Sequence, residues 1–232
     1  AVWLILQPIR MRMMLLSMPF FDGCLRRYMK QATDVFNDWA HRGKDEGMER
    51  GHSSAVNEML EVAFQRIDQG NQPFSFADLG CGNGWVVRLV GGHENCVQAD
   101  GFDGAPHMIE KAKNIDSQHG YHLALFPDTQ PSQQYDLVHS MEFIYYLHEP
   151  QEMLKSIHDD WLSEGGWAVI GIDHYMENED SLSWPEHVGV NMATRTINQW
   201  EGAWKKAGFN NVEHWIAGGK EGVTLLFVGQ KC

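Results

Sequence analysis

An acid and three glycines share one short loop of the sequence, Asp78-Leu79-Gly80-Cys81-Gly82-Asn83-Gly84, directly after an apolar stretch. Glycines at alternating positions let a backbone approach a ligand closely, and a helix that starts there presents unpaired N–H groups. Many dinucleotide enzymes carry such a loop, but the Asp78 carboxylate would repel a pyrophosphate and suits a cationic amino-acid tail better. A second acid, Asp103, ends the next expected strand, where it can accept hydrogen bonds from both hydroxyls of a ribose. These residues predict a nucleoside ligand with a positively charged tail.

The elements that must position these residues alternate along the chain. Apolar strands are expected at 76–79, 96–103, 121–126, 135–140 and 167–172, with helices at 85–90, 106–114 and 149–161. This alternation predicts an α/β fold built on a doubly wound, parallel sheet. After an irregular stretch at 173–196 and a helix at 197–207, strands at 212–216 and 223–229 are expected to form an antiparallel hairpin, which gives seven strands.

Helices are also expected before the sheet, because apolar residues recur at helical spacing near Val35 and again from about His52 to Ile67. Glycines at 43, 47 and 51 predict a loop over 42–51 between them. We interpret residues 1–23 as a leader or an extra N-terminal segment, with an added docking helix as the alternative. Residues 24–232 then form a single domain, in which 24–70 is a helical lid and 173–196 is a loop that caps the substrate.

Five segments resemble the motifs of one family, in the family's order, from about residue 32 to 228. FADLGCGNGW at 76–85 and GFDGAPHMIEKAK at 101–113 resemble the first two motifs of the class I S-adenosylmethionine-dependent methyltransferases. YDLVHSMEFIYYL, LSEGGWAVIGI and WEGAWKKAGF resemble the motifs of the fourth strand, the fifth strand and the late helix. The resemblance implies a Rossmann-like, mostly parallel seven-stranded sheet and S-adenosylmethionine as the cofactor. It also implies a set of cofactor-binding residues: Asp78, Gly80, Cys81, Gly82, Asp103, Gly104, Met108 and His139.

The sequence departs from the family's pattern at two places, one of which bears on the substrate and the other on adenine recognition. The fourth strand is followed by His139-Ser140-Met141-Glu142 rather than by Asn-Pro-Pro-Tyr, which argues against enzymes that methylate the amino groups of nucleic-acid bases. The third strand lacks a clear acid for the adenine amino group, so His122, Asp128 or a backbone carbonyl are open alternatives. A small-molecule acceptor follows by elimination.

Methyl transfer from a sulfonium needs a positioned acceptor with a neutral lone pair, and an amine acceptor must first lose a proton. The candidate catalytic groups follow the fourth and fifth strands: His139, Glu142, Asp173 and His174. Glu142 and Asp173 could instead anchor a cationic acceptor. Aromatic and imidazole side chains near the expected site are candidate substrate contacts: Trp39, His52, Tyr145, Tyr146, Tyr175 and Trp184. Aromatic faces beside carboxylates favour an ammonium group, although the loop could equally be a solvated acidic segment whose Trp packs on the core.

The net charge of −13 excludes some classes of partner, since nucleic acid and anionic lipid both require Lys and Arg. The whole excess of negative charge lies in residues 114–194, which hold fourteen acids and one base. Four scattered cysteines without CxxC spacing favour a cytoplasmic protein, and the absence of a cluster with metal-ligand spacing predicts no metal. We predict a methyltransferase, as a monomer or homodimer, whose partner is a small molecule and which binds no nucleic acid or membrane. An amine acceptor is the main hypothesis. The alternatives are an O-methyltransferase for a phenol or carboxylate, a non-catalytic methyltransferase-like binding protein, and a nicotinamide-dependent oxidoreductase.

Overall fold

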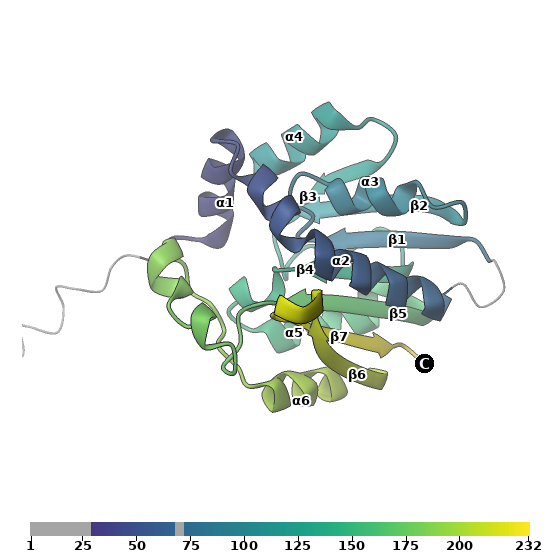
Figure 1. The fold of residues 1–232 in the computed structure, drawn as a ribbon. Helices are drawn as coiled ribbons and strands as arrows, with labels where there is room; N and C mark the ends of the chain where they lie inside the picture. The colour runs from purple at the N-terminus through teal and green to yellow at the C-terminus, as the bar shows by residue number, and fades with distance from the viewer. Residues whose placement is uncertain (1–28, 68–71) are drawn as a thin grey trace, which may run out of the picture.

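The computed structural model describes residues 29–67 and 72–232. Its strands are β1 (Phe74–Leu79), β2 (Cys96–Asp103), β3 (Gly120–Leu123), β4 (Tyr135–Met141), β5 (Leu162–Ile172), β6 (Asn210–Ala217) and β7 (Thr224–Gln230). They form one sheet in the order β3-β2-β1-β4-β5-β7-β6 (Figure 1). The first five strands pair in parallel, whereas β7 is antiparallel to both β5 and β6. The predicted fold class is confirmed. The leader predicted at 1–23 lies outside the described residues.

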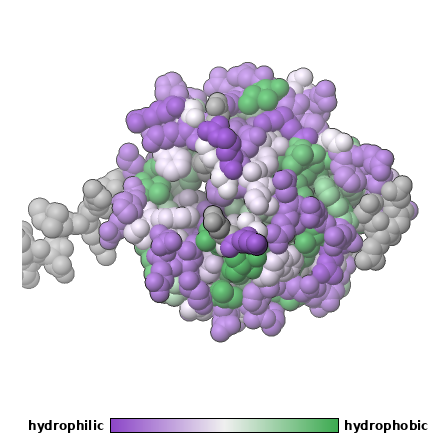
Figure 2. Space-filling model, viewed as in Figure 1, coloured by the Kyte–Doolittle hydropathy of each residue, from purple (hydrophilic) through white to green (hydrophobic). Residues whose placement is uncertain are grey.

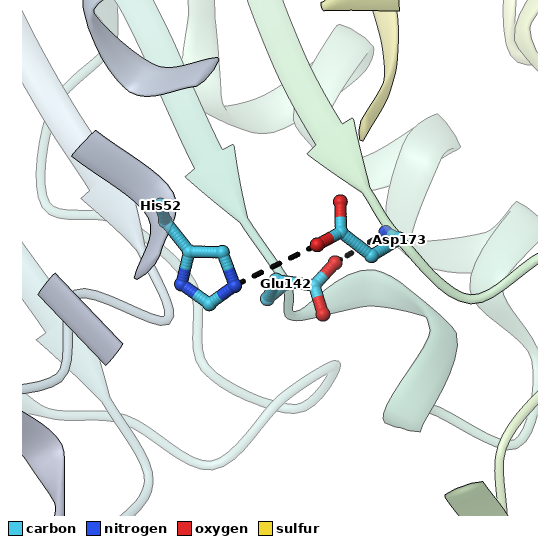
Figure 3. Close-up of side chains that lie close together, drawn as sticks. All are labelled: His52, Glu142 and Asp173. Atoms are coloured by element: carbon cyan, nitrogen blue, oxygen red, sulfur yellow. Dashed lines mark hydrogen bonds and ion pairs between the residues drawn. The ribbon is translucent and has the colours of Figure 1, made fainter. Parts of the chain in front are cut away.

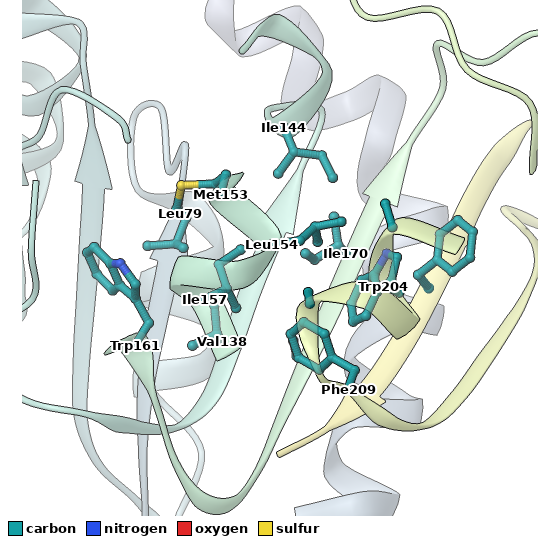
Figure 4. Close-up of a cluster of buried hydrophobic side chains, with 14 of the residues drawn as sticks. Leu79, Val138, Ile144, Met153, Leu154, Ile157, Trp161, Ile170, Trp204 and Phe209 are labelled. Carbon is teal, nitrogen blue, oxygen red and sulfur yellow. The ribbon is translucent and has the colours of Figure 1, made fainter. Parts of the chain in front are cut away.

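Helices cover both faces of this sheet. They are α1 (Ala32–His41), α2 (Asp45–Ile67), α3 (Trp85–Gly91), α4 (Pro106–Ile115), α5 (Pro150–Ser156) and α6 (Ile197–Ala207). On one face, Leu154, Trp161 and Trp204 belong to a buried cluster together with side chains of the central strands (Figure 4). On the other face, α2, α3 and α4 contribute Met59, Val87 and their neighbours to a second cluster. The second part of β5, residues 167–172, is a nearly continuous apolar run because both of its faces are buried.

The helix α2 begins earlier than the sequence indicates. The prediction of a loop over 42–51 is wrong from Asp45 onward, because that buried carboxylate anchors the first turn. Asp45 accepts a hydrogen bond from Asn83 Nδ2 at 2.9 Å and pairs with Lys111 Nζ at 2.8 Å. The helical glycines at 47 and 51 adjoin open space. Each costs about 1 kcal/mol of helix propensity, which the anchoring contacts and the buried face farther along α2 outweigh.

Two strand boundaries also differ from the prediction. β5 begins at Leu162 rather than at Trp167, so the Gly165-Gly166 pair lies inside the strand, where the register against β4 shifts. Gly165 has a φ of +80°, which accommodates that irregularity. β3 ends at Leu123, and the chain leaves the sheet there instead of continuing to Phe126. Neither difference moves the carboxyl ends of β1, β2, β4 and β5, which meet at one edge of the sheet.

Residues 173–196, which we name the cap segment, contain a 3-10 turn at Glu179–Ser181 and a π-helical turn at Pro185–Gly189. The cap segment contacts the first described residues, since Lys30 N–H donates to Gly189 O at 2.8 Å. Figure 2 shows a mostly hydrophilic face on which hydrophobic residues form separate patches. Among the described residues, no helix is long and apolar enough to cross a membrane.

Candidate functional site

The glycine loop after β1 is tied to the end of β2. Gly80, Gly82 and Gly84 all have φ between +53° and +77°, the left-handed region that favours glycine. Gly80 N–H and Cys81 N–H both donate to Phe102 O, at 2.8 and 3.1 Å. At position 80 an added Cβ would lie 2.6 Å from the Phe143 Cβ, so no larger residue fits without movement. The loop is therefore a tight cradle whose backbone faces the carboxyl edge of the sheet.

Asp103 closes this cradle from the β2 side. Its Oδ2 accepts from Gly82 N–H at 2.9 Å and its Oδ1 accepts from Ala105 N–H at 2.7 Å. Burial raises the pKa of Asp103 to about 6; the two N–H donors oppose this shift and the negative charge of Asp78 adds to it. Each carboxylate oxygen keeps a second lone pair, so the group can still accept two hydroxyl donors.

A cavity of about 230 Å³, which we name the Asp103 cavity, opens beside this carboxylate. Its walls come from α1 and the residue before it, the glycine loop, α4, and the ends of β2, β3 and β4 with the residues that follow them. The lining residues are Gln31, Ala32, Thr33, Phe36, Gly80, Gly82, Asp103, Gly104, Met108, Ala124, Leu125, Phe126, Met141, Glu142, Phe143, Tyr146 and Leu147. Apolar walls with a half-buried acid at one end fit an adenosine, in which a flat base adjoins a diol. His122 and Asp128 do not line this cavity, which leaves the backbone after β3 next to the expected base.

A smaller cavity of about 70 Å³, the Asp78 cavity, lies under α2 and shares the wall formed by Gly80, Gly82, Met108, Met141 and Glu142. Asp78 and His139 both line it, and His139 Nδ1–H donates to Asp78 Oδ1 at 2.8 Å. Cys81 also lines it, but burial raises the pKa of that thiol well above its usual range, so it stays protonated. The two cavities together fit a nucleoside and a short cationic tail.

Three titratable side chains meet where α2, β4 and β5 approach one another (Figure 3). An imidazole nitrogen of His52, a carboxylate oxygen of Glu142 and a carboxylate oxygen of Asp173 all lie within 4.8 Å of one another. His52 Nε2 is 3.6 Å from Asp173 Oδ2, and the Asp173 N–H donates to Glu142 Oε1. Tyr145 O–H donates to Glu142 Oε2 at 2.5 Å. Glu142 has a φ of +57°, a conformation that costs a non-glycine residue about 1–3 kcal/mol and is concentrated at functional sites.

This cluster, which we name the acid pair with His52, has an unusual charge balance. Burial raises the pKa of Glu142 well above its usual range, and the Asp173 charge adds to that shift. Burial also raises the pKa of Asp173. Asp173 is 6% exposed, and its Oδ1 has no hydrogen-bond partner in the part of the chain that the structure describes. A positively charged ligand beside His52 would stabilise the ionised forms of these two carboxylates. One nitrogen and two carboxylate oxygens would also suit a divalent cation. The spacing of these three residues in the sequence did not predict that they would meet.

Several of the sequence-predicted residues lie elsewhere. Both ring nitrogens of His174 are engaged, with Ser181 O at 3.0 Å and Thr194 Oγ1 at 2.8 Å, so this residue holds the cap segment together and has no free nitrogen for a base. Tyr175 O–H donates to Val223 O at 3.0 Å in the core. Trp184 stacks on His174 and lines neither cavity.

Trp39 is placed next to the site rather than in it. It packs edge-on against Phe36, and Phe36 is one of the α1 side chains that line the Asp103 cavity. Lys44 lies over the Trp39 ring, 5.5 Å from its centre. Sequence reasoning missed Phe36, although it shares the apolar face of the helix with Val35. Of the predicted tyrosines, Tyr146 lines the cavity and Tyr145 is buried behind Glu142.

Comparison with known proteins decides the family. A family profile described as a methyltransferase domain matches residues 45–214. The chain belongs to this methyltransferase family. A search of curated proteins finds no match. S-Adenosylmethionine is the cofactor of this methyltransferase.

Two solved structures show the likeness in detail. The methyltransferase in complex with the Trm112 methyltransferase activator of Haloferax volcanii is 25% identical, with a TM-score of 0.75, over 84% of this chain and 96% of that one. An S-adenosylmethionine-dependent methyltransferase of Thermotoga maritima, described as a possible histamine N-methyltransferase, is 18% identical, with a TM-score of 0.60, over 86% and 99%. The second likeness shows the fold alone.

The Haloferax complex corrects one prediction about this methyltransferase. The sequence predicted that partners are limited to a small-molecule acceptor and at most a second copy of the chain. That prediction is wrong, because the methyltransferase in the Haloferax structure is bound to a protein activator. Net charge describes how a surface treats nucleic acid or lipid, but it says nothing about docking to another protein, and so it could not have excluded one.

Proposed function

We propose that this methyltransferase transfers a methyl group from S-adenosylmethionine to the amine nitrogen of a small acceptor. The observation that carries the proposal is the acid pair with His52, which adjoins both cavities: Glu142 lines each of them and His52 lines the Asp78 cavity. The cofactor supplies an electrophilic methyl group on a sulfonium when it is bound. The protein supplies the residues that hold the two reactants and remove a proton.

In this proposal the two cavities divide the cofactor between them. The Asp103 cavity receives the adenosine, with the Asp103 carboxylate accepting from the ribose hydroxyls. The Asp78 cavity receives the amino-acid tail, with the Asp78 carboxylate accepting from its ammonium group. The reacting methyl then belongs at the wall that both cavities share, where Glu142 is the titratable side chain common to both linings.

The acid pair acts on the acceptor. An amine enters as an ammonium ion, which the two carboxylates attract, and the raised pKa of Glu142 makes its carboxylate a stronger proton acceptor than an ordinary glutamate. One N–H proton passes to a Glu142 oxygen, which frees the nitrogen lone pair. The lone pair then forms the N–C bond while the C–S bond breaks, and the sulfonium becomes a neutral thioether. Tyr145, through its hydrogen bond to Glu142, fixes the direction of the carboxylate.

A phenolate or carboxylate acceptor is less well served by this site. Its negative charge would lie against two carboxylates in a partly buried position, where like charges repel strongly. The O-methyltransferase alternative therefore predicts turnover with phenols or acids in spite of the acid pair. The non-catalytic alternative predicts cofactor binding without turnover of any acceptor.

The test is a panel of small amines, phenols and carboxylic acids, with release of S-adenosylhomocysteine as the readout. We expect turnover with amines alone, and a Glu142→Gln variant with at least about a hundredfold lower kcat/KM, in the range that general-base catalysis contributes. Glu164→Gln is the matched control, because that carboxylate is 78% exposed on β5 and adjoins neither cavity. Turnover with phenols, or unchanged turnover in Glu142→Gln, would refute the amine proposal. Activity lost on chelation and restored by Mg²⁺ or Zn²⁺ would instead assign the cluster to a metal.

We also infer that a protein activator binds this methyltransferase. The inference is supported by the Haloferax methyltransferase, which this chain resembles over 84% of its own length and 96% of the other chain's. Co-expression with the Haloferax Trm112 protein should yield one complex on size-exclusion chromatography. Separate elution of the two proteins, with no change in methyl transfer on mixing, would count against an activator of the Trm112 type.

A further inference from the structure

We infer that His139 is a positioning residue for cofactor binding, which holds the Asp78 carboxylate ready to accept the ammonium group of the cofactor's amino-acid tail. The inference rests on the role proposed above for Asp78. It assigns His139 neither to the reacting methyl group nor to the acceptor, because its ring lies on the Asp78 side of the site.

The sheet places the two residues together. Asp78 on β1 and His139 on β4 are direct partners in the parallel register. Alternation along β1 sends Asp78 to the same face as Phe76, which packs under α2 and α3, and the His139 ring lies 6.2 Å from the Phe76 ring. This face of the sheet borders the Asp78 cavity. The pair therefore sits below the cavity, on two strands whose relative position is fixed by the sheet.

The contact between them is short and buried. His139 Nδ1 and Asp78 Oδ1 are 2.8 Å apart, and the side chains are 1% and 3% exposed. An ionised carboxylate only accepts hydrogen bonds, so the ring proton lies on Nδ1. A neutral imidazole suffices for this donation, and it orients the carboxylate without cancelling the negative charge that an ammonium group needs. A Lys or Arg in this place would compete with the ligand.

The second ring nitrogen shows that packing does not explain the residue. His139 Nε2 is buried and has no hydrogen-bond partner within 29–67 and 72–232. Such an unsatisfied polar atom is costly, and an apolar residue of the same size would avoid the cost. The benefit of a histidine must then come from Nδ1, whose partner is Asp78.

The other acids around the Asp78 cavity do not duplicate this arrangement. Asp45 is committed to Asn83 and Lys111, and Glu142 to Tyr145 and the Asp173 N–H. Glu49 also lines the cavity, but it is a half-buried α2 side chain that no hydrogen bond of the described residues orients. The hydrogen bonds of the described residues use Asp78 Oδ1 alone and leave Oδ2 for a ligand. Fixing Oδ1 removes the freedom of the carboxylate to rotate, so that Oδ2 is already oriented before the cofactor arrives.

The test compares two ligands by calorimetry: S-adenosylhomocysteine, and 5′-methylthioadenosine, which lacks the amino-acid tail. His139→Leu should weaken S-adenosylhomocysteine binding by roughly ten- to a hundredfold, the range for a hydrogen bond to a charged group. Binding of 5′-methylthioadenosine should change by less than about twofold in the same variant. His139→Asn should restore most of the lost affinity, because its amide nitrogen can occupy the place of Nδ1. Asp78→Asn should show the same ligand preference, and His139→Leu should add little to it.

Equal weakening of both ligands by His139→Leu, or no rescue by His139→Asn, would overturn the inference in favour of a structural role. Unchanged S-adenosylhomocysteine binding in His139→Leu alongside a loss in Asp78→Asn would overturn it while leaving the role of Asp78 intact. If Asp78→Asn also has no effect, the proposed placement of the tail fails as well. Should the leucine variant not fold, His139→Gln takes its place, since its longer side chain puts the amide near Nε2 and away from Asp78.

Discussion

Replacing Asp103 by Asn separates the binding role of this carboxylate from its effect on stability. Burial raises its pKa from an ordinary value of 3.8 to about 6, so between these two pH values the folded protein holds a proton there that the unfolded chain has released. The gap corresponds to about 3 kcal/mol by which ionised Asp103 destabilises the fold at pH 7. The sign follows from linkage: between about pH 4 and pH 6 the folded state binds more protons, so this contribution weakens the fold as pH rises.

The Asp103→Asn variant carries no charge on this side chain at any pH, so the substitution removes this dependence. It also loses one of the two backbone hydrogen bonds, since the NH₂ group of an amide cannot accept, and the side chain must accept from both Gly82 N–H and Ala105 N–H. That loss costs about 1–3 kcal/mol at every pH. The difference in unfolding free energy between wild type and Asp103→Asn should therefore shift by about 3 kcal/mol from pH 4 to pH 7, in favour of the variant.

Urea denaturation of both proteins, repeated every 0.5 pH units, measures that difference. The contributions of the other titrating groups are the same in both proteins and cancel. Calorimetry with S-adenosylhomocysteine at pH 7.5 should show that the variant has lost most of its affinity, because one hydroxyl acceptor has become a donor. A difference that stays flat with pH would refute the buried-charge reasoning. Retained affinity would refute the assignment of Asp103 to the ribose.

Three further predictions concern the cradle, the cap segment and the acid pair. Gly80→Ala should abolish cofactor binding because its Cβ meets Phe143, whereas Gly82→Ala, with φ +53° and open space, should cost only backbone strain; calorimetry compares the two. His174→Ala removes two buried hydrogen bonds and should lower the unfolding free energy by about 2–4 kcal/mol, with new proteolytic cuts inside 173–196 visible by mass spectrometry. Tyr145→Phe removes a hydrogen bond that lowers the pKa of Glu142, so the acidic limb of the pH profile of kcat/KM should move to higher pH. A cut pattern or a pH profile identical to wild type would contradict the respective prediction.

Local patterns in the sequence predicted most of the framework. The helix Ile197–Ala207 appears with the predicted limits, because Thr196 forms a capping box with Gln199 and Gly208 ends the helix in the left-handed region. The glycine loop and Asp103 were predictable because they follow strands that end at the same edge of the sheet. The early start of α2 was not, since the contact that anchors it joins Asp45 to residues far along the chain.

The site itself depends on such distant contacts. His52 comes from a helix that precedes the sheet, while Glu142 and Asp173 follow two different strands, so no spacing in the sequence brings the three together. His174 had the right residue type at a strand end, but its neighbours in space, Ser181 and Thr194, use both nitrogens. Residue type and position at a strand end were enough to predict Glu142 and Asp173. The packing of the cap segment, which the sequence does not reveal, engages both nitrogens of His174, and His52 is the histidine that lies beside the two acids.

The position of β7 inside the sheet has a consequence for synthesis of the protein. This strand is last in chain order, yet it lies between β5 and β6 and hydrogen-bonds to both. While the ribosome has released the chain only as far as β6, β5 pairs with β4 on one side, but its other edge has no partner strand. Nascent chains in that interval are exposed to edge-to-edge aggregation. A pause in translation before Thr224 should therefore increase the demand for chaperones, even though the binding loops are already made.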